Sequence, residues 1–179
     1  LVKRRDARGK LGECTLLDVD HGPCERVLLV GLGKKETFGR KQYKKALLAA
    51  AAAVARTGAH DAVSFLSTEP VEATDAYYRG RLAAESVGSA LYRIPVIRSA
   101  RQPAAPALRS FGIALPDKDQ LAEAGRGLEH GRCIAAGAAL TRDLANLPAN
   151  VCTPSYLARQ ARELAREYRS IRAEVLDEP

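Results

Sequence analysis

The chain has 179 residues, of which 46% are hydrophobic and 27% charged, and its formal net charge is +7. This composition is typical of a globular chain of one domain or slightly more, and it excludes disordered and fibrous proteins. The longest apolar run, residues 46–55, is far shorter than the ~20 residues that span a bilayer. The basic start of the chain also lacks the apolar segment of a secretory signal. We therefore expect a cytoplasmic protein without a membrane partner.

Two strands and a helix are predicted at the start of the chain. Residues 13–19 and 25–30 are short apolar segments on either side of an Asp-His-Gly-Pro turn signal, which predicts neighbouring strands. Apolar residues then recur at three- and four-residue steps over residues 40–57, which predicts a helix that Gly58 ends. Residues 61–67 follow as a third strand.

The middle of the chain contains two further helical patterns. Residues 74–94 are predicted to form a helix with Thr74 as its N-cap, and residues 108–115 a strand. The next helical pattern covers residues 121–147 and contains interspersed glycines. Each glycine weakens a helix, so either close packing or a break between Gly125 and Gly131 is expected.

The last part of the chain is predicted to be an amphipathic helix over residues 154–168 and a strand over residues 171–177. Strands that alternate with helices indicate an α/β fold with a mixed, mainly parallel sheet and flanking helices. A terminal strand with no element after it suggests the start of a truncated second domain. The chain also contains no Met, which indicates that residue 1 is not a translational start.

Metal and disulfide chemistry are weakly indicated. The four cysteines are irregularly spaced, which favours reduced, mostly buried thiols; they are Cys14, Cys24, Cys133 and Cys152. The pairs His21 with Cys24 and His130 with Cys133 are each spaced like half of a zinc site, but such a site needs four ligands. The carboxylates and imidazole of residues 18–22 could hold a divalent cation, but an ordinary turn is the preferred explanation.

The segment 30–39, Val-Gly-Leu-Gly-Lys-Lys-Glu-Thr-Phe-Gly, lies between a predicted strand and a predicted helix, where phosphate groups can bind. Glu36 stands where the dinucleotide motif requires Gly, so a tight turn is the preferred interpretation of Gly31 and Gly33. The densest positive cluster begins here. Its candidate nucleic-acid contacts are Lys34, Lys35, Arg40, Lys41, Lys44 and Lys45, and a solvated surface is the alternative.

A compact joint connects the last two predicted helices. The segment 142–158, Arg-Asp-Leu-Ala-Asn-Leu-Pro-Ala-Asn-Val-Cys-Thr-Pro-Ser-Tyr-Leu-Ala, resembles the bridge between the two domains of the leucyl aminopeptidase family. The matching positions are Arg142, Asp143, Leu144, Asn146, Pro148, Asn150, Thr153 and Pro154. Residues 26–36 and 85–94 are similar to the family's first strand and turn and to a Tyr-containing helix end.

The resemblance implies a domain organisation. Residues 1–145 would be the amino-terminal domain, which is similar to the macro-domain fold. Residues 146–179 would be the interdomain linker helix and the first strand of the missing catalytic domain. In the family, two divalent metal ions, zinc or manganese, are bound in that later domain and activate a water for attack on the peptide. The segments that carry those ligands are absent here, so no residue inherits a catalytic, metal or cofactor role.

The joint also has a direct physical explanation. Pro148 would end the preceding helix, while Thr153 would cap the next helix and Pro154 would suit its first turn. Asn146 and Asn150 could bond the freed backbone groups, and Arg142 with Asp143 could tie the corner to either domain. The joint is therefore predicted to be structural.

Three functions follow. The leading one is a non-catalytic amino-terminal domain that supports assembly of a leucyl-type aminopeptidase, a hydrolase that acts on peptides and, by resemblance, forms hexamers. The second is a DNA-binding module that acts through the basic cluster, since some bacterial family members bind DNA. The third is a nucleotide or ADP-ribose binder, by analogy with macro domains.

Overall fold

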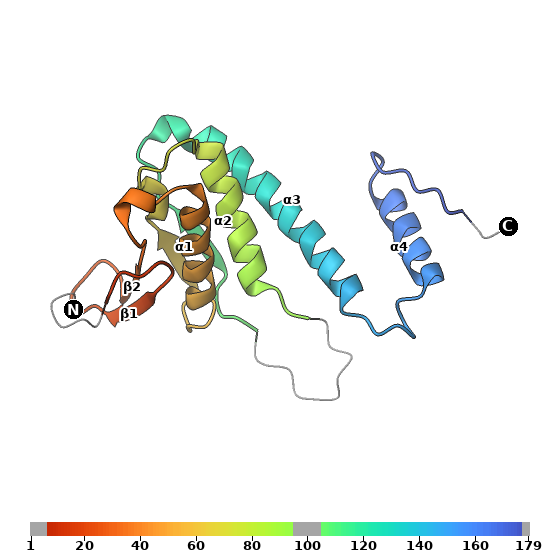
Figure 1. Cartoon of the computed structure of the whole chain (residues 1–179), viewed down its shortest axis with the longest axis horizontal. Coiled ribbons are helices and arrows are strands. Elements are labelled where there is room, and N and C mark those ends of the chain that lie inside the picture. Colours follow the sequence, from red (N-terminus) through yellow and green to blue (C-terminus); the bar gives the residue numbers. More distant parts are fainter. Residues whose placement is uncertain (1–6, 95–104, 177–179) are drawn as a thin grey trace. The chain divides into compact units, whose positions relative to one another are not determined.

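The computed structural model describes residues 7–94 and 105–176. The chain forms two compact units, Leu1–Gly137 and Ala138–Pro179, which we call the first and the second unit. The division lies inside helix α3 (Leu121–Ala145), ahead of the domain boundary predicted after residue 145. Each unit is described separately below, and Figure 1 shows their elements.

A short antiparallel hairpin begins the first unit. Strands β1 (Cys14–Asp18) and β2 (Arg26–Val30) pair from Cys14 opposite Val30 to Asp18 opposite Arg26. His21 in the connecting turn has a positive φ of 61°, a conformation that Asn, Asp and His adopt more readily than most residues. Both predicted strands are therefore confirmed.

A second pair of strands is parallel. Strands β3 (Asp61–Ser64) and β4 (Ser110–Ile113) pair with Asp61 opposite Ser110 and Ser64 opposite Ile113. Parallel strands need a long crossover, and a helix lies in this one. The α/β class is confirmed. In the described part of the chain, however, the strands form two separate two-stranded sheets instead of a single mixed sheet.

The core lies where α1 (Arg40–Val54) packs against α2 (Ala76–Leu91). The two helices run side by side in Figure 1. Its central side chains are Tyr43, Leu47, Val71, Leu82 and Ala83. The alanine-rich stretch of α1 allows this approach, because Ala46, Ala50 and Ala51 are also buried. A helix with several alanines on its buried face can lie close to its neighbour.

The end of α1 and the start of α2 differ slightly from prediction. Helix α1 ends at Val54, before the predicted residue 57, because the Thr57 hydroxyl and N–H both donate to the Val54 carbonyl and tighten the last turn. Thr74 is not the N-cap of α2. The Asp75 carboxylate accepts from the Tyr78 N–H at 2.6 Å, whereas the Thr74 hydroxyl donates to the Val71 carbonyl.

Helix α3 is continuous, so of the two alternatives for its glycines the structure shows close packing and no break between Gly125 and Gly131. Its glycines permit contact with the backbone of α2. A Cβ atom at Gly127 would lie 2.1 Å from the Tyr77 carbonyl oxygen, and one at Gly131 would lie 2.2 Å from that of Arg81. Such distances exclude any side chain, so the two helices meet backbone to backbone.

The second unit contains the end of α3, the joint and helix α4 (Pro154–Glu167). None of its described residues is buried. The strand predicted over residues 171–177 is wrong for the described residues 171–176, which follow a turn closed by the Ile171 N–H and the Tyr168 carbonyl. A strand needs a neighbour for its backbone groups, and no described segment pairs with this one.

Candidate functional site

The predicted basic cluster forms one exposed surface on η1 (Lys35–Thr37) and the start of α1. We call it the basic surface; its six members, all exposed, are Lys34, Lys35, Arg40, Lys41, Lys44 and Lys45. The helical period explains the separation of charge from core, because Tyr43 and Leu47 lie on the buried face of the same helix. The six side chains are therefore exposed to solvent, and their contact with nucleic acid stays a prediction.

Arg40 at the edge of the basic surface is held by an aromatic ring. Its guanidinium carbon lies 4.2 Å from the centre of the Tyr78 ring, and that of Arg81 lies 5.7 Å from the same centre. Both distances fall within the range of cation–π attraction. Tyr78 thus links the start of α1 to α2, a contact that no local sequence signal indicates.

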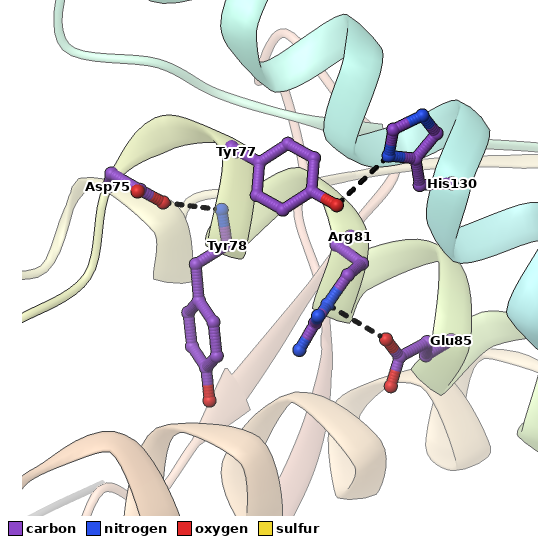
Figure 2. A network of polar contacts seen from close by, with 6 residues as sticks. All are labelled: Asp75, Tyr77, Tyr78, Arg81, Glu85 and His130. Carbon is purple, nitrogen blue, oxygen red and sulfur yellow. Dashed lines mark hydrogen bonds and ion pairs between the residues drawn. The ribbon is translucent and has the colours of Figure 1, made fainter.

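A network of polar contacts lies where α2 faces α3 (Figure 2). The Tyr77 hydroxyl lies 2.9 Å from His130 Nδ1, and the two rings meet edge to face with centres 5.6 Å apart. His130 was a candidate zinc ligand together with Cys133. Its Nδ1 instead shares a hydrogen bond with Tyr77, and this structural contact was not predicted.

One ion pair lies beside this contact on α2. Arg81 Nε is 3.1 Å from Glu85 Oε1, which makes an ion pair. The contact does not count as a hydrogen bond, and Nε is buried without a hydrogen-bond partner among the described residues. The residues are four apart on the helix, a spacing that brings side chains together. Both side chains are partly exposed, so the pair contributes little to stability.

Polar side chains gather at the carboxyl ends of the two parallel strands. The Ser67 hydroxyl donates to the carbonyls of Ser64, at the end of β3, and Ala114, directly after β4, at 3.4 and 2.5 Å. Arg79 donates to the Ser67 carbonyl, and its Nε donates to the Thr74 hydroxyl at 3.2 Å. Ligands often bind at this edge of α/β sheets, but here the polar groups satisfy the backbone and act as structural ties.

Tyr43 carries the largest pKa change described in the core. Burial raises the pKa of its phenol to about 12, while the nearby Arg79 charge lowers it and Tyr78 raises it. The Tyr43 hydroxyl has no hydrogen-bond partner among the described residues. A tyrosine phenol is neutral at physiological pH even at its ordinary pKa, and burial moves its ionisation further away. Tyr43 therefore serves as a packing residue of the core.

The candidate metal ligands are not brought together. No group of three or more His, Cys, Asp or Glu side chains that could hold a metal ion occurs in residues 7–94 and 105–176. All four cysteines are free, with Cys24 and Cys133 exposed rather than buried as predicted. Burial raises the pKa of the Cys14 thiol, while the charge of Arg56 lowers it. Neither of the half-sites considered from the sequence, His21 with Cys24 or His130 with Cys133, is completed among the described residues.

The glycines after β2 have structural explanations. A Cβ atom at Gly31 would lie 2.1 Å from the Lys10 carbonyl oxygen, and Gly33 has a φ of +79°. Both positions therefore require Gly for close approach or backbone conformation. At the start of α1, the Gly39 N–H donates to the Gln42 side chain at 3.3 Å. This N–H is one of the backbone groups that a bound phosphate would need as a donor, and it is already used. The tight-turn interpretation accounts for this segment.

A small cavity lies beside the hairpin. Its volume is about 170 Å³, and it is lined by Ala7, Arg8, Gly9, Glu13, Thr15, Leu29, Val30 and Gly31. The Glu13 carboxylate accepts from the backbone N–H groups of Arg8 and Lys10 at 3.1 and 3.2 Å. Ligand pockets commonly measure ~300–1,000 Å³, so this cavity is small for a nucleotide or ADP-ribose, and that alternative stays a prediction.

Local hydrogen bonds fix the turn of the joint between α3 and α4. The Asn146 side chain and N–H both donate to the Arg142 carbonyl, at 2.7 and 3.0 Å, after α3 ends at Ala145. The Pro148 carbonyl accepts from the Val151 and Cys152 N–H groups, both at 2.9 Å. These bonds close the turn that precedes α4.

Helix α4 begins as predicted. The Thr153 hydroxyl accepts from the Tyr156 N–H at 3.3 Å, and Pro154 is the first helical residue. Asn150 is exposed in the turn. The contacts predicted for Asn150 and for Arg142 with Asp143 stay predictions, as does the wider structural role of the joint between domains.

No helix in residues 7–94 and 105–176 combines the length and apolar character needed to cross a bilayer.

Comparison with known proteins identifies relatives. Probable cytosol aminopeptidases of Actinobacillus pleuropneumoniae serotype 5b and Chromobacterium violaceum are each 38% identical to this chain, over 99% and 98% of it. The matches cover 36% and 34% of those relatives. The chain thus spans about a third of their length.

Solved structures agree with this relationship. The bottromycin maturation enzyme BotP, in one structure in complex with Mn, matches with a TM-score of 0.72 and 28% identity over 93% of this chain and 33% of BotP. A second BotP structure gives the same TM-score at 29% identity. Residues 1–101 match the family model described as "Cytosol aminopeptidase family, N-terminal domain". The resemblance seen in the joint is confirmed, and the chain belongs to the cytosol aminopeptidase family.

Proposed function

We propose that this chain is the non-catalytic amino-terminal part of a metal-dependent aminopeptidase that removes N-terminal residues from peptides. The observation that carries the proposal is the match of residues 1–101 to the family's amino-terminal domain. It is supported by the relatives named as probable cytosol aminopeptidases, which are 38% identical over 99% and 98% of this chain. In the whole protein, two-metal hydrolysis would require a clamp of metal ligands.

The role assigned to this chain is support and assembly. The first unit has a packed core of its own, and the joint provides a bonded corner before α4. Zinc or manganese would be held elsewhere in the whole protein, in keeping with the matching structure of BotP in complex with Mn. We extend the proposal to a cytoplasmic homo-hexamer of the whole protein, with this chain beside its own catalytic domain.

Activity and metal measurements on the purified chain test this proposal. We expect no hydrolysis of leucine-p-nitroanilide above that of a mock purification, with or without added Mn²⁺ or Zn²⁺. Equilibrium dialysis should likewise find no stoichiometric metal. Metal-dependent turnover that follows the chain through two different columns, and is missing from the mock purification, would overturn the proposal.

Nucleic-acid binding is a second candidate, favoured by the exposure of all six side chains of the basic surface. Retention of duplex DNA should weaken with salt, because each phosphate contact releases counterions. Lys41→Glu, Lys44→Glu and Lys45→Glu together should abolish that retention. The matched control reverses three exposed charges elsewhere, Lys10, Lys118 and Arg132. Equal loss in both triple variants would show general charge attraction and contradict a site on the basic surface.

A further inference from the structure

Two threonines of the first unit end the same kind of short turn. Thr37 is the last residue of η1 and Thr68 the last residue of η2 (Leu66–Thr68), and both are exposed. The Thr37 hydroxyl donates to the Lys34 carbonyl at 3.2 Å. The Thr68 hydroxyl donates to the Phe65 carbonyl, also three residues earlier, at 2.7 Å. The two hydroxyls therefore share one local conformation, and their surroundings make the difference between them.

Those surroundings carry opposite charge along the sequence. Thr37 lies inside the basic surface, and the charged residues within four positions of it are Lys34, Lys35, Glu36, Arg40 and Lys41. The charged residues within four positions of Thr68 are Glu69 and Glu72. Arg79 lies near Thr68 but is already held by hydrogen bonds. A phosphate ester would therefore be attracted by most charges around Thr37, whereas the sequence neighbours of Thr68 would repel it.

The structure around Thr37 also favours a negative group. About 120° of rotation separates successive residues of a 3-10 helix, so the Glu36 carboxylate projects in a different direction from the Thr37 hydroxyl. Arg40 begins α1, and its guanidinium is already held 4.2 Å from the centre of the Tyr78 ring. Gly39, the N-cap of α1, has no side chain that could accept from the first N–H groups of the helix. A charge of −2 next to this helix start would be stabilised by both the cations and the helix dipole.

We propose that Thr37 is a phosphorylation site, modified by a protein kinase that selects basic residues ahead of its target, and that the phosphate ester then occupies the basic surface. Lys34 and Lys35 stand three and two residues before the hydroxyl, and charge patterns of this kind distinguish kinase substrates. The consequence for binding rests on the second candidate function, nucleic-acid binding. The phosphate ester would compete with nucleic-acid phosphates for the same lysines, so phosphorylation would switch that binding off.

The reaction is phosphoryl transfer from a nucleoside triphosphate. Thr37 Oγ1 forms a bond to the terminal phosphorus, the bond from that phosphorus to the bridging oxygen breaks, and a nucleoside diphosphate leaves. The hydroxyl proton passes to the catalytic base of the kinase. The hydroxyl gives up its bond to the Lys34 carbonyl, but the Thr37 N–H still donates to that carbonyl at 3.2 Å. The turn that ends η1 therefore keeps its backbone bond after modification.

The first experiment locates the modification. The chain is incubated with MgATP and a serine/threonine kinase that prefers Lys or Arg three and two residues before its target. We expect one phosphate per chain, at Thr37 by fragmentation mass spectrometry, added at least ~10-fold faster than at Thr68 because the kinase discriminates by charge. Thr37→Ala should abolish incorporation, and Thr68→Ala should leave it unchanged. Absence of phosphate, or its addition mainly at another residue, would overturn the proposal.

The second experiment asks whether the phosphate occupies the basic surface. Cations beside a phosphate ester favour its doubly charged form, so its second pKa should fall by about half a unit relative to the same chain unfolded in urea. Phosphorus NMR during a pH titration measures this shift. Arg40→Gln/Lys41→Gln leaves the kinase recognition residues intact and should remove most of the shift, whereas Lys118→Gln/Arg132→Gln should keep it. An unshifted pKa in the folded chain would contradict occupation of the basic surface.

Retention of duplex DNA separates this inference from the second candidate function. If the unmodified chain retains DNA, phosphorylation at Thr37 should weaken its affinity by at least ~10-fold, since phosphate contacts are lost; equal affinity would overturn the switch and leave nucleic-acid binding intact. Thr37→Glu should weaken binding more than Thr68→Glu, which adds the same charge elsewhere. If the unmodified chain retains no DNA, yet Thr37 is phosphorylated and the pKa of its ester falls, the second candidate function fails and the phosphorylation site stands.

Discussion

The two units of this chain are ordered by different means. The first unit buries its own core, with Tyr43, Leu47 and Leu82 each about 1% exposed. The second unit has local order in its bonded joint and capped helix, yet none of its described residues is buried. Hydrogen bonds and caps can therefore specify the path of a chain without supplying the apolar burial that stabilises it.

The sharpest test of this difference removes one leucine from each unit. Leu82→Ala should lower the free energy of unfolding of the first unit by about 3 kcal/mol, because it leaves a cavity in a fully packed core. Leu157→Ala should change the free energy of unfolding by less than about 0.5 kcal/mol, since Leu157 is 44% exposed. Urea unfolding followed by circular dichroism measures both, and equal losses would contradict the comparison.

A second pair of variants tests how α2 and α3 meet. Gly127→Ala should destabilise the first unit by about 2 kcal/mol, since the added Cβ would collide with the Tyr77 carbonyl. Gly125→Ala lies in the same helix with nothing within 4 Å, and it should stabilise by up to about 1 kcal/mol. Thermal unfolding of the two variants should therefore shift in opposite directions; shifts of the same sign would argue against the close backbone contact.

Loss of the helix caps should have smaller effects that again differ between the units. Asp75→Ala should cost about 1 kcal/mol of the unfolding free energy of the first unit, because the Tyr78 N–H loses its acceptor. Thr153→Ala should reduce the helicity of α4 and leave unfolding of the first unit unchanged. Amide hydrogen exchange resolves the two segments, and a Thr153→Ala variant that weakens the first unit would show that the units are energetically coupled.

The smallest effect at neutral pH is expected at Tyr43. Its folded pKa of about 12 lies above the ordinary value of 10.0, so the stability that neutral Tyr43 contributes is complete below pH 10 and is lost between about pH 10 and 12. Tyr43→Phe should be nearly neutral at pH 7, because the hydroxyl has no described partner. It should remove the last phase of a phenolate absorbance titration; persistence of that phase would refute the assignment.

Local patterns predicted the elements well, and tertiary contacts account for what they missed. The apolar period of α1 predicted its buried face, and the Thr-Pro pair predicted the start of α4. For the glycines of α3 the sequence left close packing and a break open, and the structure shows close packing, because Gly127 fits against the backbone of α2. That contact involves two helices that lie apart in the sequence, so helix propensities of neighbouring residues cannot predict it.

The polar contacts of the candidate site show the same limit. His130 was considered for zinc from its spacing to Cys133, yet it bonds to Tyr77, 53 positions earlier. Ser67 donates to the carbonyl of Ala114, and Arg79 donates to the carbonyl of Ser67. Every residue has a backbone carbonyl, so the sequence does not indicate which of them will accept these bonds. Residue type and spacing predict which side chains can form hydrogen bonds, whereas the tertiary fold determines which groups they bond to.

The backbone contact between α2 and α3 has a consequence for evolutionary divergence. Where two helices touch through glycines, their spacing depends on the main chain, and the side chains around the contact are free to change. Gly80, Gly127 and Gly131 should therefore tolerate less replacement than the apolar residues beside them. This would allow relatives such as BotP to keep the architecture, with a TM-score of 0.72, at 28% identity.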